Sequence, residues 1–120
     1  MIVGEFTYRR GSYLIKIADR PVCTIERFDA AALKHWITSE YVTDEEIPVY
    51  EHWTDKQVGF IYLDKEIRLL HLVIDGVKYG IRYSHFVGVV SENQVSAEII
   101  GANPALRMDK AQSTLAGVMV

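Results

Sequence analysis

The chain contains little cysteine and no run of apolar residues long enough to cross a membrane. Its single thiol, Cys23, excludes an intrachain disulfide framework and a zinc site made of several thiolates. No apolar run approaches the ~20 residues that a membrane-spanning helix requires. The first residues, MIVGEFTYRR, lack the basic stretch and apolar core of a signal peptide. We therefore expect no membrane association and a cytoplasmic location.

Positive charge is also scarce. The chain has 13 lysines and arginines against 16 aspartates and glutamates, which leaves a net charge of −3. A nucleic-acid-binding protein needs a basic stripe that displaces the counterions of the phosphates, and no such stripe is visible. We therefore expect no nucleic-acid partner. Acidic residues are concentrated in residues 36–66, where only Lys56 and Lys65 oppose them, and this segment is suited to a basic protein partner.

Motifs that carry catalysis or hold a cofactor are missing as well. The histidines show neither helical i, i+4 pairing nor the spacing of a Cys/His metal site. Ser84 and His85 are adjacent, and adjacent residues of a strand point to opposite faces of a sheet. There is no G-x-S-x-G nucleophile elbow and no glycine-rich phosphate loop. The sequence therefore predicts no catalytic residue, no metal site and no cofactor.

Two β-hairpins are the clearest structural signals in the sequence. Asp75-Gly76 joins two β-rich runs, and such a dipeptide favours a two-residue type I′ turn because both central residues need positive φ. A second hairpin turns at Arg10-Gly11. The later turn pairs Ile74 with Val77, Leu72 with Tyr79, Leu70 with Ile81 and Arg68 with Tyr83 on one face, and Val73 with Lys78, His71 with Gly80, Leu69 with Arg82 and Ile67 with Ser84 on the other. The earlier turn pairs Tyr8 with Tyr13, Phe6 with Ile15, Gly4 with Ile17, Glu5 with Lys16 and Thr7 with Leu14.

Between the hairpins the pattern predicts one helix, over about residues 29–41. Asp29 is a favoured N-cap, and a stripe of apolar residues follows at helical spacing, as expected for a helix packed on a sheet. The stripe consists of Ala30, Leu33, Trp36 and Ile37. Further strands are expected over residues 22–28, 47–53, 58–63 and 95–100. The chain is thus predicted to be a single domain, residues 1–120, of the α+β class and β-dominated. We expect a curled antiparallel meander sheet or small β-barrel of six to eight strands with one packed α-helix, and a two-layer sandwich is the alternative.

The second face of the main hairpin is not simply polar. A turn at Lys65-Glu66 would set Tyr62 opposite Leu69 and Phe60 opposite His71, so that aromatic residues lie on the supposedly wet side. Either the predicted helix or a second subunit should cover this face.

The segment Ser84–Val90 extends beyond its partner in the predicted ladder. We expect it to be a strand that bends at Gly88 and needs a mate, because the backbone groups of an unpaired strand must be satisfied. The apolar segment 114–120 is a second candidate for a subunit contact.

The hairpin VIDGVKYGIRYSHFVGVV resembles hairpins of small β adaptor domains in signalling proteins, including pleckstrin-homology-like barrels. The likeness covers one hairpin and implies no role for any residue. The early position of the predicted helix departs from the C-terminal helix of that barrel.

For function we predict a non-enzymatic protein-interaction or regulatory (adaptor) module that forms a homo-oligomer, most simply a homodimer. The expected interface residues are Tyr41, Tyr50 and Trp53 in the acidic region 40–55, where an unidentified protein partner is also expected, and Ser84, His85, Phe86, Val87 and Val89. The alternative is a small-ligand-binding β-barrel, or an enzyme whose site is assembled from dispersed residues. That pocket would be lined by Tyr62, His71, Arg82 and His85. A deep pocket inside the sheet would favour the alternative, and a filled interior would favour the interaction module.

Overall fold

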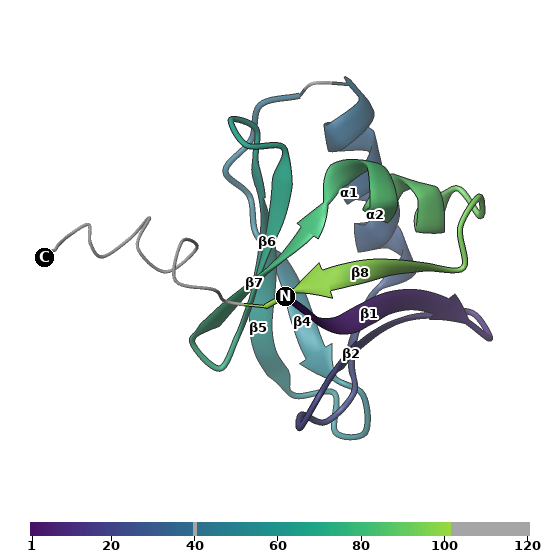
Figure 1. Ribbon diagram of the computed structural model, residues 1–120, viewed down its shortest axis with the longest axis vertical. Helices are drawn as coiled ribbons and strands as arrows, with labels where there is room; N and C mark the ends of the chain where they lie inside the picture. Colours follow the sequence, from purple (N-terminus) through teal and green to yellow (C-terminus); the bar gives the residue numbers. More distant parts are fainter. Residues whose placement is uncertain (40, 102–120) are drawn as a thin grey trace, which may run out of the picture.

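The computed structural model describes residues 1–39 and 41–101 of the chain (Figure 1). Its strands form a closed antiparallel barrel, in which each strand pairs with the next along the chain and β8 returns to β1. The elements are β1 (Ile2–Arg9), β2 (Ser12–Ile17), β3 (Cys23–Ile25), α1 (Arg27–Ser39), β4 (Ile47–Glu51), β5 (Gln57–Asp64), β6 (Leu69–Ile74), β7 (Val77–Arg82), α2 (Tyr83–Val90) and β8 (Ser96–Ile100). The predicted β-dominated α+β fold is therefore confirmed, as a barrel. The segment 114–120 lies outside the described residues.

Both predicted hairpins form. Asp75-Gly76 has φ values of 49° and 80°, and Arg10-Gly11 has values of 52° and 83°, so both turns have the positive φ angles of type I′. The predicted pairs are observed in the β1–β2 and β6–β7 ladders, with two exceptions, Arg68 with Tyr83 and Ile67 with Ser84. The β6–β7 ladder ends before Arg68 and Tyr83, and the Arg68 guanidinium instead lies over the Tyr83 ring, 5.5 Å from its centroid.

The connection between β5 and β6 is longer than predicted. It covers residues 65–68 instead of Lys65-Glu66, which shifts the ladder by two residues and sets Tyr62 opposite His71. Asp64 stabilises the longer turn, because its Oδ1 accepts two backbone N–H groups of the turn at 3.1 and 3.4 Å. A shift of two residues keeps every side chain on its own face, so the hydrophobic pattern cannot distinguish the two registers.

The segment Ser84–Val90 is helical, and our prediction of an overhanging strand is wrong. Three buried side chains of α2, those of Tyr83, Phe86 and Val89, recur at helical spacing. A strand would send alternate residues to opposite faces, whereas a helix puts these three on one face. The Phe86 ring is fully buried and stacks on Phe6 with 4.9 Å between centroids. The structure thus has a second helix, whose packing outweighs the β propensity of its valines.

The first helix begins earlier than predicted. The Ala30 N–H donates to the Glu26 carbonyl at 2.9 Å, so Asp29 lies in the first turn of α1 and not at its N-cap. The predicted apolar stripe is nevertheless correct, since Ala30, Leu33 and Ile37 are buried. The strands β3 and β4 are shorter than expected.

Side chains fill the interior of the barrel. An eight-stranded barrel is just wide enough for its own side chains to occupy the inside. The Phe6 ring stacks on both Phe86 and Tyr13, with 5.6 Å between the centroids of Phe6 and Tyr13. The largest fully buried side chains are Phe6, Phe86, Ile15, Leu33, Ile61, Leu70, Leu72, Ile74, Ile81, Ile99 and Val49.

The antiparallel order distributes the connections over two ends of the barrel. The helix end carries α1, α2, the β1–β2 turn and the turn 65–68. The turn end carries the turns that join β2 to β3, β4 to β5 and β6 to β7. The helices pack against each other, side by side in Figure 1, and α1 also contacts β2. Helix α1 therefore caps one end of the barrel. It does not cover the outer wall of β5 and β6, although we had expected either this helix or a second subunit to do so.

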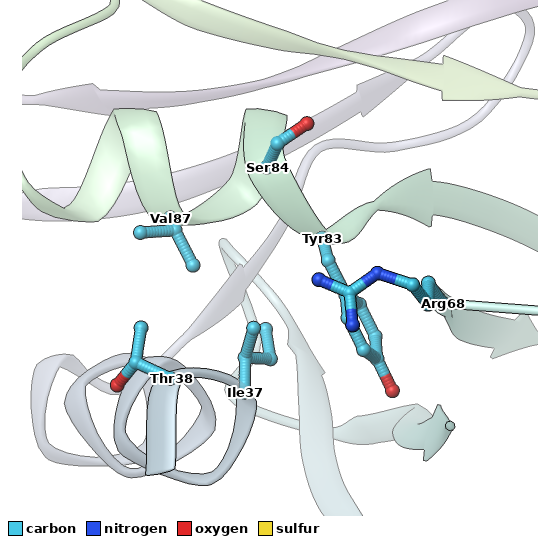
Figure 2. A pocket seen from close by; sticks show the side chains of 6 residues that line it. All are labelled: Ile37, Thr38, Arg68, Tyr83, Ser84 and Val87. Carbon is cyan, nitrogen blue, oxygen red and sulfur yellow. The ribbon is translucent and has the colours of Figure 1, made fainter. Parts of the chain in front are cut away.

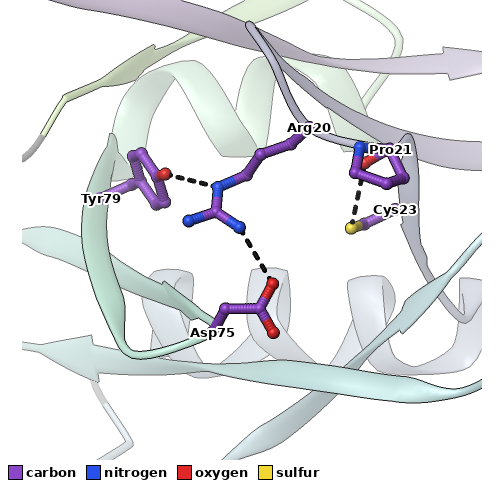
Figure 3. Close-up of polar contacts among 5 residues, drawn as sticks. All are labelled: Arg20, Pro21, Cys23, Asp75 and Tyr79. Carbon is purple, nitrogen blue, oxygen red and sulfur yellow. Dashed lines mark hydrogen bonds and ion pairs between the residues drawn. The ribbon is translucent and has the colours of Figure 1, made fainter.

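Arg20 ties the turn end together (Figure 3). Its Nε donates to the Tyr79 hydroxyl at 2.8 Å, and its Nη1 lies 3.0 Å from Asp75 Oδ2. These contacts connect the β2–β3 turn with β7 and the β6–β7 turn. Among the described residues, no helix is long and apolar enough to span a membrane.

Candidate functional site

A hollow of about 320 Å³ lies at the helix end, where α1, α2 and the turn 65–68 meet (Figure 2). Val87 points from α2 toward α1, and the Arg68 side chain reaches in from the turn. The hollow is lined by Ile37, Thr38, Arg68, Tyr83, Ser84 and Val87. Its lining therefore combines two aliphatic side chains with three residues that carry a hydroxyl group and with one positive charge.

The local backbone places the Arg68 side chain in this hollow. Arg68 has a φ of 55°, a left-handed conformation that costs a non-glycine residue about 1–2 kcal/mol. The surrounding turn enforces it, because Asp64 binds two N–H groups of the turn and Lys65 Nζ donates to the Trp36 carbonyl at 2.8 Å. Among the described residues Arg68 forms no ion pair, and its guanidinium contacts the Tyr83 ring.

Tyr83 forms the aromatic wall of the hollow. Its side chain is buried, and this burial, together with the nearby Asp64 carboxylate, raises the pKa of Tyr83 above its ordinary value. A phenol with a raised pKa stays neutral at physiological pH, so it is not a general base. Its ring supplies a face on which the Arg68 guanidinium rests.

Exposed apolar side chains occur in the segments that follow α1 and precede Arg68. Tyr41 and Ile67 are each 53% exposed and Val42 is 83% exposed. The Tyr41 ring lies 6.4 Å from Trp36, the residue before the lining residue Ile37 in α1. Three exposed acids, residues 44–46, follow in the same loop. The helix end thus carries both a cationic hollow and an apolar and acidic loop, residues 41–46.

The predicted patch of Tyr41, Tyr50 and Trp53 does not form as one surface. Tyr41 lies before β4 at the helix end, whereas Trp53 lies in the turn after β4 at the turn end. Tyr50 is a half-buried residue of β4 itself. Trp53 is 81% exposed, and its ring packs on the edge of His52 with 4.8 Å between centroids.

The residues predicted in the segment 84–89 have different environments. Ser84 and Val87 line the hollow, and His85 is partly exposed on α2. Phe86 and Val89 lie in the core of the chain itself, so they stabilise the fold and offer no surface for a partner.

The residues proposed to line a ligand pocket do not face the inside of the barrel. Tyr62 and His71 lie together on the outer wall, with 4.9 Å between their ring centroids, and His71 Nε2 lies 3.0 Å from Asp64 Oδ2. Arg82 is exposed at the end of β7, and His85 belongs to α2. The interior is occupied by the hydrophobic core.

Two further features of the described residues bear on chemistry, the possible metal ligands and the Cys23 thiol. In residues 1–39 and 41–101, no three His, Cys, Asp or Glu side chains come together as metal ligands. Cys23 is buried, and this burial, reinforced by the carboxylates of Glu51 and Asp75, raises the pKa of its thiol. A thiol with a raised pKa is a poor nucleophile.

Of the lining residues, Ser84 and Val87 were predicted from the sequence, whereas Ile37, Thr38, Arg68 and Tyr83 were not. One signal in the sequence could have revealed them. Tyr83, Phe86, Val87 and Val90 are spaced at i, i+3, i+4 and i+7, and this spacing indicates a helix. A second helix at this position would have implied a groove beside α1.

Comparisons of the chain with protein-family models, with curated proteins and with solved structures give no match.

Proposed function

We propose that this protein is a non-enzymatic interaction module that forms a two-fold homodimer through its helix end. One observation carries the proposal: the helix end holds two surfaces of complementary charge. One is the hollow with Arg68, which forms no ion pair with any other residue that the structure describes. The other is the exposed loop 41–46, which carries two apolar side chains and three acids.

Two-fold symmetry requires this arrangement. In an isologous interface the same patch serves both copies, so each patch must be complementary to itself. In the proposed dimer the loop 41–46 of each copy lies on the hollow of the other. Its acids meet Arg68, and Val42 covers the apolar residues Ile37 and Val87. An arginine that contacts carboxylates can form paired, charge-assisted hydrogen bonds, which are stronger than neutral ones.

The filled interior supports an interaction module over a ligand-binding barrel. A ligand inside the barrel would have to displace side chains such as Phe6, Phe86 and Leu72, all of which are fully buried. Losing the packing of a large buried side chain reduces the free energy of unfolding by several kcal/mol, about 3–5 kcal/mol when a phenylalanine is truncated to alanine.

Charge reversal at the two complementary surfaces tests the dimer. The first variant carries Arg68→Glu, and the second, the lysine-loop variant, carries Asp44→Lys, Glu45→Lys and Glu46→Lys. We expect wild type to be dimeric at tens of micromolar by light scattering coupled to gel filtration, and each variant alone to be monomeric. An equimolar mixture of the two variants should be dimeric again, because both contacts then join opposite charges.

Lys56→Glu is the matched control, since it makes the same charge change at the turn end and should leave the dimer intact. A monomeric wild type at this concentration would refute the proposal. So would a dimer that survives Arg68→Glu, or a mixture that fails to associate.

A further inference from the structure

The turn end presents a large aromatic surface to solvent. Trp53 is 81% exposed, although tryptophan is highly buried on average. It lies in the turn between β4 and β5, next to the turns that Arg20 ties together (Figure 3). It is therefore on the opposite end of the barrel from the proposed dimer contact.

Hydrogen bonds hold the turn that carries Trp53. The Asp55 N–H donates to the Glu51 carbonyl at 2.9 Å, and the Glu51 N–H donates to the Lys56 carbonyl at 2.8 Å. The Thr54 hydroxyl donates to Glu51 Oε1 at 2.8 Å. The backbone N–H of the neighbouring His52 donates to the carbonyl of Val22 at 2.9 Å, which anchors the turn to the β2–β3 connection. The indole is thus presented on a preorganised support, which lowers the entropic cost of binding.

The surroundings of Trp53 are acidic. Within the described chain, Glu51 and Asp55 form no ion pair, whereas Asp75 is paired with Arg20. Glu51 and Asp75 both border a small hollow of about 50 Å³ at this end. Lys56 is the one cation within the turn 52–56 itself. A positively charged ligand would therefore meet an aromatic face and two unneutralised carboxylates.

We propose that the turn end is a docking surface for a basic segment of a partner protein. An arginine or lysine of that segment stacks on the Trp53 indole, and neighbouring basic residues approach Glu51 and Asp55. Tryptophan is the best aromatic partner for a cation, and tryptophan is enriched among the residues that dominate binding energy at interfaces. The carboxylates contribute the complementary charge that guides association and excludes acidic partners. This contact is independent of the dimer, and both copies of a dimer formed through the helix end would offer it.

A synthetic peptide of alternating arginine and serine is a suitable probe. Binding is followed by the fluorescence anisotropy of a labelled peptide on addition of the full chain. We expect saturable binding that weakens with added salt, and no binding of the same peptide with glutamate in place of arginine. Trp53→Ala should weaken binding by about tenfold or more. Glu51→Gln and Asp55→Asn should also weaken it and reduce the dependence on salt, because each removes one charge.

The controls separate recognition from loss of structure. Gln at position 51 retains an acceptor for the Thr54 hydroxyl, and Asn tolerates the φ of 58° found at Asp55. Phe28 is 82% exposed in α1, so Phe28→Ala removes an equally exposed aromatic ring elsewhere and should not change binding. Equal affinity for wild type and Trp53→Ala, or equal losses for Trp53→Ala and Phe28→Ala, would overturn the proposal. The Arg68→Glu variant should bind the peptide like wild type, so this surface and the dimer are tested separately.

Discussion

Replacing Phe86 by alanine tests whether α2 is part of the core. The Phe86 side chain is fully buried, and its ring stacks on Phe6 with 4.9 Å between centroids. Truncation of a buried phenylalanine to alanine costs about 3–5 kcal/mol, and the lost aromatic pair accounts for about 0.5–1.5 kcal/mol of that. A domain of this size has a free energy of unfolding of about 5–15 kcal/mol. We therefore expect Phe86→Ala to remove a large part of the free energy of unfolding.

Urea unfolding followed by circular dichroism measures this loss. Both proteins should carry Arg68→Glu, because dimerisation would make the apparent stability depend on protein concentration. With an m value of about 1–3 kcal/mol per molar urea, a loss of ~4 kcal/mol lowers the midpoint by more than about 1 M. Val87→Ala, at a half-buried position of the same helix, should cost about 1 kcal/mol. If the two variants lose the same stability, α2 is not anchored in the barrel through Phe86.

Two further predictions concern the strands and the turn 65–68. Gly59→Ala should destabilise the barrel by about 2 kcal/mol or more, because a Cβ there would lie 1.9 Å from the carbonyl oxygen of Val73 on the paired strand. Gly80→Ala should cost less, since its Cβ would meet the movable Leu69 side chain at 2.8 Å, and equal losses in thermal melts would contradict this. Burial raises the pKa of Asp64, but hydrogen bonds from the neighbouring imidazole and from backbone N–H groups of the turn outweigh it and lower the pKa below its ordinary value. In the unfolded chain the pKa of this carboxyl is ~3.9. At pH values above that, the carboxylate therefore stabilises the folded state, and this stabilisation is lost as the pH falls through the lower pKa of the folded state. In urea titrations from about pH 5 down to about pH 2, Asp64→Asn should lose less stability than wild type, and equal slopes would argue against the interaction.

The two hairpins were predictable because their information is local. At Asp75-Gly76 the turn residues specify a two-residue loop, and that loop specifies the register of both strands. The stripe of Ala30, Leu33 and Ile37 likewise identified the buried face of α1. In each case the residues that decide the structure lie close together in the chain.

The β5–β6 turn was not predictable in the same way. Registers that differ by two residues bury the same side chains, so the hydrophobic pattern allows both. The longer turn is stabilised by Asp64, whose Oδ1 accepts the backbone N–H groups of Glu66 and of Ile67, a residue that the shorter turn would have placed in the ladder.

The candidate site depends on helix α2, most of which was predicted from the sequence to be a strand. Ser84 and Val87 were predicted as surface residues, but their neighbours Ile37 and Arg68 became part of one hollow only because α2 is a helix. The same change moved Phe86 from an expected interface into the core.

By itself, the sequence determined two hairpin registers, the buried stripe of α1 and a meander of strands rich enough in apolar residues to curl into a barrel. Only the tertiary structure decided that the barrel closes between β8 and β1, that residues 83–90 turn into a helix and that a hollow forms beside α1. The physical reason is that the contacts that decide these features join residues far apart in the chain. The packing of Phe86 depends on Phe6, a residue distant in the chain, and this burial outweighs the local preference of a valine-rich segment for a strand.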